Sequence, residues 1–89
     1  MTEVLKVSAT SNPNLVAGAI AGSIRQTGEA EIQAIGASAV NQAIKAAAIA
    51  CNFLEPTGVK LAFKPSFMEI ETNGEVRTAI RLLSVILAE

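Results

Sequence analysis

The chain contains no histidine and only one cysteine, Cys51. Histidine is the commonest general base and metal ligand in proteins, so its absence removes the simplest route to acid–base catalysis. A single cysteine forms no intrachain disulfide and is too little for a structural zinc site. Ser11 and Ser38 have no partner base, so the sequence gives no support for a serine nucleophile. We therefore expect a protein that is not an enzyme and that holds no metal and no cofactor.

A surplus of positive charge is also missing. Seven basic residues stand against eight acidic ones, and the formal net charge is −1. Nucleic-acid-binding domains usually carry a clear basic excess. Binding of DNA or RNA would therefore require a local cluster of cations, formed by the fold or by several subunits together. The cations available are Lys6, Arg25, Lys45, Lys60, Lys64, Arg77 and Arg81.

The chain has no uninterrupted apolar run long enough for a membrane. Residues 7–24 carry no charge, but Asn12, Pro13 and Asn14 interrupt them, whereas a membrane span needs about 20 apolar residues. The first ten residues lack the basic and apolar segments of a signal peptide. Cys51 lies in an apolar helical stretch, which is compatible with a reducing cytosol. We expect a cytoplasmic protein with no membrane partner.

Apolar residues are abundant for so short a chain. Of its 89 residues, 51% are hydrophobic and 17% are charged, against about 25% charged in typical domains. A chain of this size forms one domain, residues 1–89, and buries only about 60–65% of its unfolded surface. Self-association is a common way to enlarge such a core. We expect the protein to associate with copies of itself as a homodimer or homotetramer.

Hydrophobic periodicity and turn residues predict the element order β-α-β-α-β-β. Asn12 followed by Pro13 is a helix start, and Gly28 supplies its left-handed end. Ser38 is the expected N-cap of the second helix, and Asn73-Gly74 is a strong hairpin signal. The predicted helices are 13–27 and 38–52, and the predicted strand segments are 3–9, 30–35, 59–63, 66–72 and 75–86.

This order predicts an α+β fold, with two helices on one face of a four-stranded mixed sheet and a long C-terminal hairpin. Pro65 cannot donate to a sheet ladder, so we expect an edge position or a bulge there. The hairpin carboxylates Glu69, Glu71 and Glu75 are interpreted as solvated charges that pair with Arg77 across the strands. The sheet face without helices would stay uncovered or would be covered by a second subunit.

Two helical surfaces are candidates for contacts. On the second helix we expect a buried face made of Val40, Ala43, Ile44, Ala47 and Cys51. Ile49 is expected within the polar stripe of the same helix. Gly18 and Gly22 form a GxxxG spacing beside Leu15, which suits tight packing within the chain and a subunit contact equally well. The predicted self-association residues are Leu15, Gly18, Gly22 and Ile49.

Three segments resemble the stage V sporulation protein S family: VSATSNPNLVAGAIAGSIR, AEIQAIGASAVNQAIKAAAIA and NGEVRTAIRL. The likeness covers about residues 2–83, and that family in turn resembles the Alba-like fold of small nucleic-acid-binding proteins. The resemblance implies binding through the loop before the first helix, the start of the second helix and the hairpin arm. The loop, residues 10–14, has no lysine. The implied nucleic-acid-binding residues are Ser11, Asn12, Asn14, Ser38, Asn41, Gln42, Lys45 and Arg77.

The resemblance implies a non-catalytic regulatory protein of bacterial development, in sporulation or cell-division timing, that binds DNA or RNA. An alternative is a protein–protein interaction module without nucleic-acid binding, suggested by the near-neutral charge and the GxxxG face. A third is a small-molecule binder at the Gly36–Ser38 turn, where helix-start amides attract phosphate.

Overall fold

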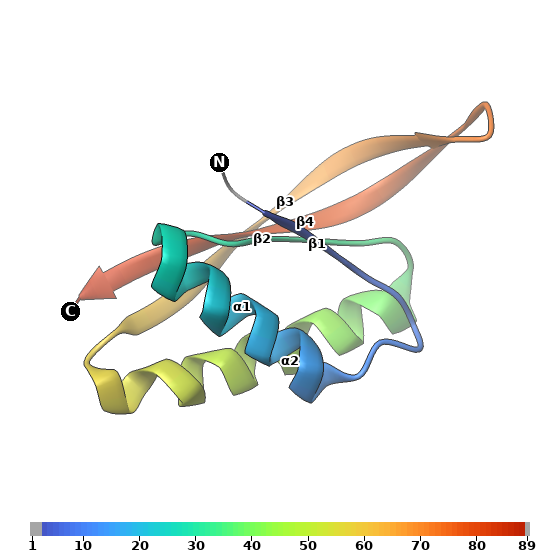
Figure 1. The fold of residues 1–89 in the computed structure, drawn as a ribbon. Coiled ribbons are helices and arrows are strands. Elements are labelled where there is room, and N and C mark those ends of the chain that lie inside the picture. The colour runs from blue at the N-terminus through green and yellow to red at the C-terminus, as the bar shows by residue number, and fades with distance from the viewer. Residues whose placement is uncertain (1–2, 89) are drawn as a thin grey trace.

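Both helices pack on one face of a four-stranded mixed sheet (Figure 1). The structure is a computed structural model that describes residues 3–88. The strands lie in the order β1-β2-β4-β3; β1 and β2 are parallel, and β4 runs antiparallel to both its neighbours. The predicted α+β fold and element order are confirmed. The elements are β1 Val4–Val7, α1 Pro13–Thr27, β2 Glu31–Ala34, α2 Ala37–Leu54, the 3-10 turn η1 Glu55–Thr57, β3 Lys60–Thr72 and β4 Glu75–Ala88.

Helix α1 has the predicted ends. The Asn12 side chain accepts hydrogen bonds from the first-turn amides, Pro13 follows at the first helical position, and Gly28 closes the helix with φ 83°. The prediction for the start of α2 was wrong. The helix begins at Ala37 after Gly36, whose φ is 89°, and no side chain caps it. Ser38 already lies inside the first turn, because the N-cap is Gly36, two residues before the expected one.

The buried face of α2 is built largely from alanine. Ala39, Ala43, Ala46, Ala50 and Leu54 pack with α1 and the inner sheet face. Small side chains allow the two helices to approach each other closely. The predicted burial of Ile44 was wrong, since it is 51% exposed, while Val40 and Cys51 are half-buried. Ile49, predicted in the polar stripe, is half-buried against the core.

Strands β3 and β4 form a hairpin that extends beyond the helices (Figure 1). We call its outer part, residues 67–80, the arm. Asn73 and Gly74 turn it with φ values of 53° and 77°, as the Asn-Gly pair predicts. β3 lies at an edge of the sheet, which confirms the edge placement of Pro65, and the ladder shifts register between Lys60 and Leu61.

Candidate nucleic-acid interface

The loop before α1 and the start of α2 form one polar edge. The Gln42 side-chain amide donates to the Ser11 backbone oxygen at 2.9 Å. Within the loop, the Ser8 backbone N–H donates to Ser11 Oγ at 2.9 Å, and the Ser11 N–H donates to the Ser8 carbonyl at 3.1 Å. These bonds preform the loop, so the fold brings together two of the segments that the resemblance implied.

The residues of this edge differ in how free their polar groups are. Asn12 Oδ1 accepts from the backbone N–H of Asn14 at 2.9 Å and of Leu15 at 3.3 Å, so its oxygen is committed to the helix cap. Ser11 Oγ is committed to the loop. The side chains that remain exposed and available for a ligand are Asn14, Ser38, Asn41 and Lys45.

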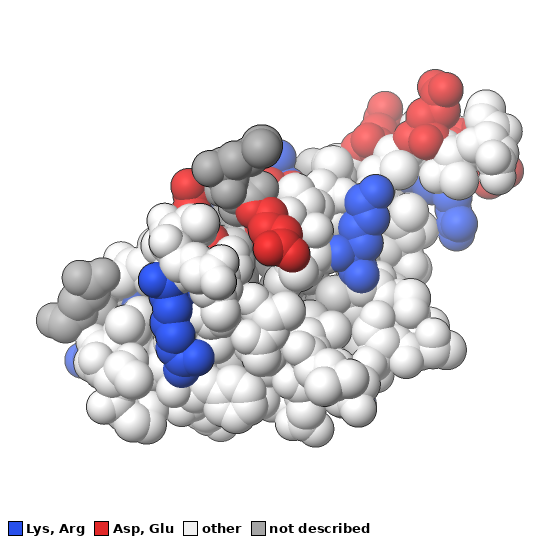
Figure 2. Space-filling model, viewed as in Figure 1, with Lys and Arg blue, Asp and Glu red and all other residues white. Residues whose placement is uncertain are grey.

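Arg77 lies apart from this edge. It pairs with Ile70 in the arm and alternates with Val76 and Thr78, so it faces away from the helices. Glu69 and Glu71 pair with Thr78 and Val76 on the opposite side of the arm. The predicted cross-strand pairing of those two carboxylates with Arg77 was therefore wrong. Figure 2 shows acidic side chains gathered over the outer end of the arm.

The face of the sheet opposite the helices carries a row of polar side chains across all four strands. Lys6 pairs with Gln33, Gln33 with Arg81, and Arg81 with Ser66. Their neighbours along the strands, such as Ile32 and Leu82, are buried on the helix side. Strands lie about 4.8 Å apart, so the row crosses roughly 14 Å. Arg81 Nε donates to Ser66 Oγ at 3.4 Å, which orients the guanidinium.

Lys64 and Arg77 extend this row into a basic surface. Lys64 lies two residues before Ser66 on β3, and Arg77 lies four residues before Arg81 on β4, so both share the uncovered side. We call Lys6, Lys64, Arg77 and Arg81 the basic face. Four of the seven cations of the chain thus gather on one side, where the register also places Glu31 and Glu75. Glu31 accepts a hydrogen bond from Gln33 at 2.8 Å.

Sequence reasoning missed this basic face, although part of its signal was present. Lys6 stands between Leu5 and Val7, and Arg81 stands between Ile80 and Leu82. Period-two alternation places each cation opposite the buried side of its strand. What the sequence does not reveal is the register that aligns these strands, because β4 inserts between β2 and β3.

A hollow of about 260 Å³ adjoins the basic face where the arm bends over β1 and β2. Ile70 of the arm forms one wall, and residues 6–9, Gln33 and Ile35 form the rest. The side chain of Lys6 therefore borders a concave surface. A concave basic surface holds a polyanion closer to its charges than a convex one does.

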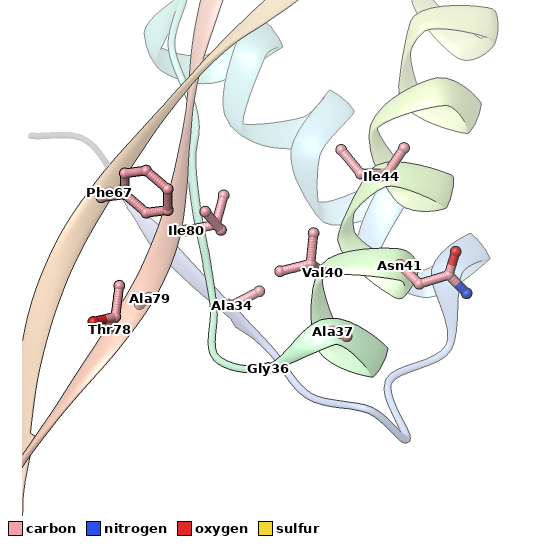
Figure 3. A pocket seen from close by; sticks show the side chains of 10 residues that line it. All are labelled: Ala34, Gly36, Ala37, Val40, Asn41, Ile44, Phe67, Thr78, Ala79 and Ile80. Atoms are coloured by element: carbon pink, nitrogen blue, oxygen red, sulfur yellow. The ribbon is translucent and has the colours of Figure 1, made fainter.

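A larger apolar groove of about 580 Å³ lies on the helix side, between α2 and the arm (Figure 3). Val40 and Ile44 come from α2, and Phe67 and Ile80 come from the arm strands. Gly36 also lines it, so the turn proposed for a small molecule opens on an apolar surface. We call this cavity the apolar groove.

The predicted self-association residues lie on different surfaces. Leu15 is 74% exposed, and Gly18 is exposed beside it on α1. A methyl group added at Gly18 or Gly22 would meet no atom within 4 Å, so packing within the chain does not require these glycines. Ile49 contacts the core of its own chain instead.

Two further observations concern metals and membranes. Within residues 3–88 no group of three or more cysteine and acidic side chains is placed to hold a metal ion. Neither helix in this part of the chain combines the length and apolar character needed to cross a bilayer.

These surfaces define a small two-layer α+β domain with a polar edge, a basic sheet face and a projecting arm. Comparison with known families identifies it further. The Stage V sporulation protein S (SpoVS) family matches residues 3–87 of the 89, so the chain belongs to that family. It is accordingly a sporulation-related protein.

Proposed function

We propose that this protein is a non-catalytic, cytoplasmic regulator of bacterial development that binds nucleic acid. Membership of a sporulation-related family supports the biological role. The observation that carries the binding activity is the basic face, where the fold gathers Lys6, Lys64, Arg77 and Arg81 despite a net charge of −1. Lysine and arginine on one surface neutralise phosphates and release counterions, which gives salt-dependent affinity.

The chemistry of this face favours the phosphate backbone over the bases. Proteins that hold single strands stack bases on aromatic side chains. All three aromatic residues are phenylalanines, and they lie elsewhere: Phe53 is on α2, while Phe63 and Phe67 pair with helix-side residues of β4. The affinity would therefore depend little on the base sequence of the nucleic acid.

The polar edge adds neutral phosphate contacts. Exposed Asn14, Ser38 and Asn41 can donate to phosphate oxygens, and Lys45 supplies one charge. In this proposal the basic face provides most of the electrostatic attraction, and the edge is a second and weaker contact.

Binding can be measured by fluorescence anisotropy with labelled duplex DNA, duplex RNA and single strands at about 50 and 200 mM salt. Removing three charges with Lys6→Gln, Lys64→Gln and Arg81→Gln should make the slope of log K against log salt shallower by about 3 for B-DNA. The matched control is Arg25→Gln, which removes an exposed cation of α1 outside both surfaces and should leave the slope unchanged. Failure of the folded wild-type protein to bind any probe at low salt would refute the proposal.

The alternative, a protein-interaction module without nucleic-acid binding, is favoured by the apolar groove alone. A pull-down from lysate treated with nuclease separates the two functions. Partners retained after nuclease treatment, together with no binding of purified nucleic acid, would establish the alternative.

We also propose that the protein associates with itself, as a homodimer or homotetramer. The supporting observation is that large apolar side chains are left exposed. Phe67, Leu15 and Leu87 are each more than 60% exposed.

A further inference from the structure

The hollow beside the basic face has walls that are mostly apolar. Its volume is about 260 Å³, and it lies where β1 and β2 end and the arm continues past them. Ile35 lines it directly after β2, Ala9 lines it from the loop before α1, and Ile70 lines it from the arm. Pockets for drug-sized ligands begin at about 300 Å³, so this hollow suits a smaller group such as a single ring system.

The walls of the hollow are held in place by the fold itself. Two hydrogen bonds between Ser8 and Ser11, at 2.9 and 3.1 Å, fix the wall formed by the loop. On the sheet, the side-chain nitrogen of Gln33 donates to Glu31 Oε2 at 2.8 Å. This bond orients the Gln33 amide and leaves its oxygen able to accept from a ligand. A site that is already formed binds its ligand at a smaller cost in entropy.

Positive charges stand on two sides of the hollow. Lys6 lines it from β1, on the sheet side. Arg77 is the cross-strand partner of Ile70, so the two side chains share one side of the arm, with Cβ atoms about 5 Å apart. Because Ile70 is a wall of the hollow, Arg77 adds a cation on the arm side. The acidic residues on the same side of the sheet are Glu31 and, near the arm tip, Glu75.

This arrangement matches a nucleotide within a strand better than a free small anion. A nucleotide within a strand has a phosphate on each side of its nucleoside, whereas a free mononucleotide has a phosphate on one side only. Lys6 also begins the polar row that crosses the sheet, which gives a strand a path away from the hollow. Two cations on either side of an apolar hollow correspond to phosphate, base and phosphate in turn.

We propose that the hollow holds the base of one unpaired nucleotide in a nucleic acid that lies on the basic face. Ile35 and Ile70 pack on the base, and Gln33 accepts a hydrogen bond from its edge. Lys6 and Arg77 bind the flanking phosphates. Taking a paired base out of a duplex costs a few kcal/mol, so a nucleotide that is already unpaired is favoured.

This inference rests on the proposed nucleic-acid binding and names the class of nucleic acid, a duplex with a bulged nucleotide. Unpaired bases expose N–H donors on their Watson–Crick edges, and one acceptor oxygen takes any of them. The hollow therefore selects for the absence of pairing and not for a base sequence.

Three DNA duplexes of equal length test the hollow by fluorescence anisotropy. One is fully paired, one has a single bulged nucleotide, and one has an abasic bulge. The abasic probe keeps the flexibility of a bulge and lacks only the base. The wild-type protein should bind the base-bearing bulge roughly five- to tenfold tighter than the abasic bulge, because aliphatic packing lies at the low end of what a stacked base contributes.

Two substitutions remove the apolar site without changing the charge. Ile70→Ser deletes a wall and Ala9→Leu fills the space, so each should reduce the ratio of the two bulge affinities to about 1. The matched control is Val76→Ser, which changes an exposed aliphatic residue on the other side of the arm and should keep the wild-type ratio. Circular dichroism checks that each variant folds.

Methyl NMR locates the base directly. The δ1 methyl signals of Ile35 and Ile70 should shift more with the base-bearing bulge than with the abasic bulge. The signal of Ile44, which lies in the apolar groove, should respond equally to both probes.

The possible failures can be told apart. Equal affinity of the wild-type protein for the two bulges, with duplex binding that depends on the basic face, would overturn the role of the hollow alone. A preference for the base that survives both Ile70→Ser and Ala9→Leu would also overturn it, because the base would then be held elsewhere. Failure to bind any of the three probes would overturn the proposed nucleic-acid binding together with this inference.

Discussion

Asn12 illustrates how one side chain can be committed to the fold although the resemblance implied a binding role. Its Oδ1 accepts two backbone N–H groups at the start of α1, at 2.9 and 3.3 Å. The oxygen is therefore unavailable to a ligand, and only the amide NH2 remains free. Asn14, two residues later, is exposed, and its side chain takes no part in this cap.

We expect Asn12→Ala to lower the free energy of unfolding by about 1 kcal/mol, because two first-turn amides lose their acceptor. Asn14→Ala, the matched control, should change it by less than about 0.5 kcal/mol. Urea denaturation followed by circular dichroism measures both. Equal effects of the two substitutions would show that the Asn12 cap does not add to the free energy of unfolding.

Cys51 is a second residue whose chemistry follows from its packing. Its thiol donates to the Leu61 carbonyl at 3.2 Å. Burial, and then the negative charge of Glu55, raise the pKa of the thiol above its ordinary value of 9.0. The folded state thus holds this proton more tightly than the unfolded state does. Its contribution to stability is complete below the ordinary pKa and is lost as pH rises through the raised value.

We therefore expect the wild-type protein to lose stability above about pH 9 more steeply than Cys51→Ala, which has no thiol to ionise. Urea midpoints measured from neutral to alkaline pH provide the comparison. Parallel curves for the two proteins would contradict the assigned role of the thiol.

At the scale of elements, α1 carries two glycines whose conformation does not explain their presence. Gly18 and Gly22 lie in the helix interior, where glycine costs about 1 kcal/mol relative to alanine. A methyl group at either position meets no atom within 4 Å. Gly18 is exposed and Gly22 is half-buried, so neither position is enclosed by the rest of the chain.

We expect Gly18→Ala and Gly22→Ala each to raise the free energy of unfolding by roughly 0.5–1 kcal/mol without changing the assembled mass. Thermal unfolding and light scattering measure the two effects. Loss of assembly in either variant would instead show that another backbone approaches α1 at these glycines.

Local signals predicted the elements well wherever the residues act on their own neighbours. The Asn12–Pro13 start, the Gly28 end and the Asn73-Gly74 turn are set by backbone preferences within a few residues. The start of α2 was misplaced because Ser38 has the residue type of a cap, whereas the chain turns at Gly36, whose φ of 89° only glycine adopts readily. Residue type alone does not show whether the helix starts after Gly36 or at Ser38.

Surfaces were predicted less well than elements, because they depend on pairing between distant strands. The polar edge followed from the resemblance, and the Gln42–Ser11 contact brings its parts together. The basic face requires the register of β4 against β2 and β3. Ile44 was misassigned to the core because its side of α2 lines the open groove beside the arm, where its side chain stays 51% exposed.

At the scale of the whole molecule, stability should depend on concentration if copies bind one another. Association favours the folded state by mass action, so a hundredfold increase in concentration adds about 2.7 kcal/mol per dimer, or half that per chain. For a domain of this size, that raises Tm by roughly 5–10 °C. Differential scanning calorimetry at about 5 and 500 μM checks the shift, and a constant Tm would contradict association.

Pro65 has a consequence for how far such assembly can proceed. It lies within β3, an exposed edge strand 13 residues long, and it has no N–H to offer a neighbouring chain. Long unprotected edges are templates for fibre growth, and a proline interrupts the template. If copies of this protein associate as proposed, Pro65 keeps their sheets from merging into one continuous ribbon along this edge.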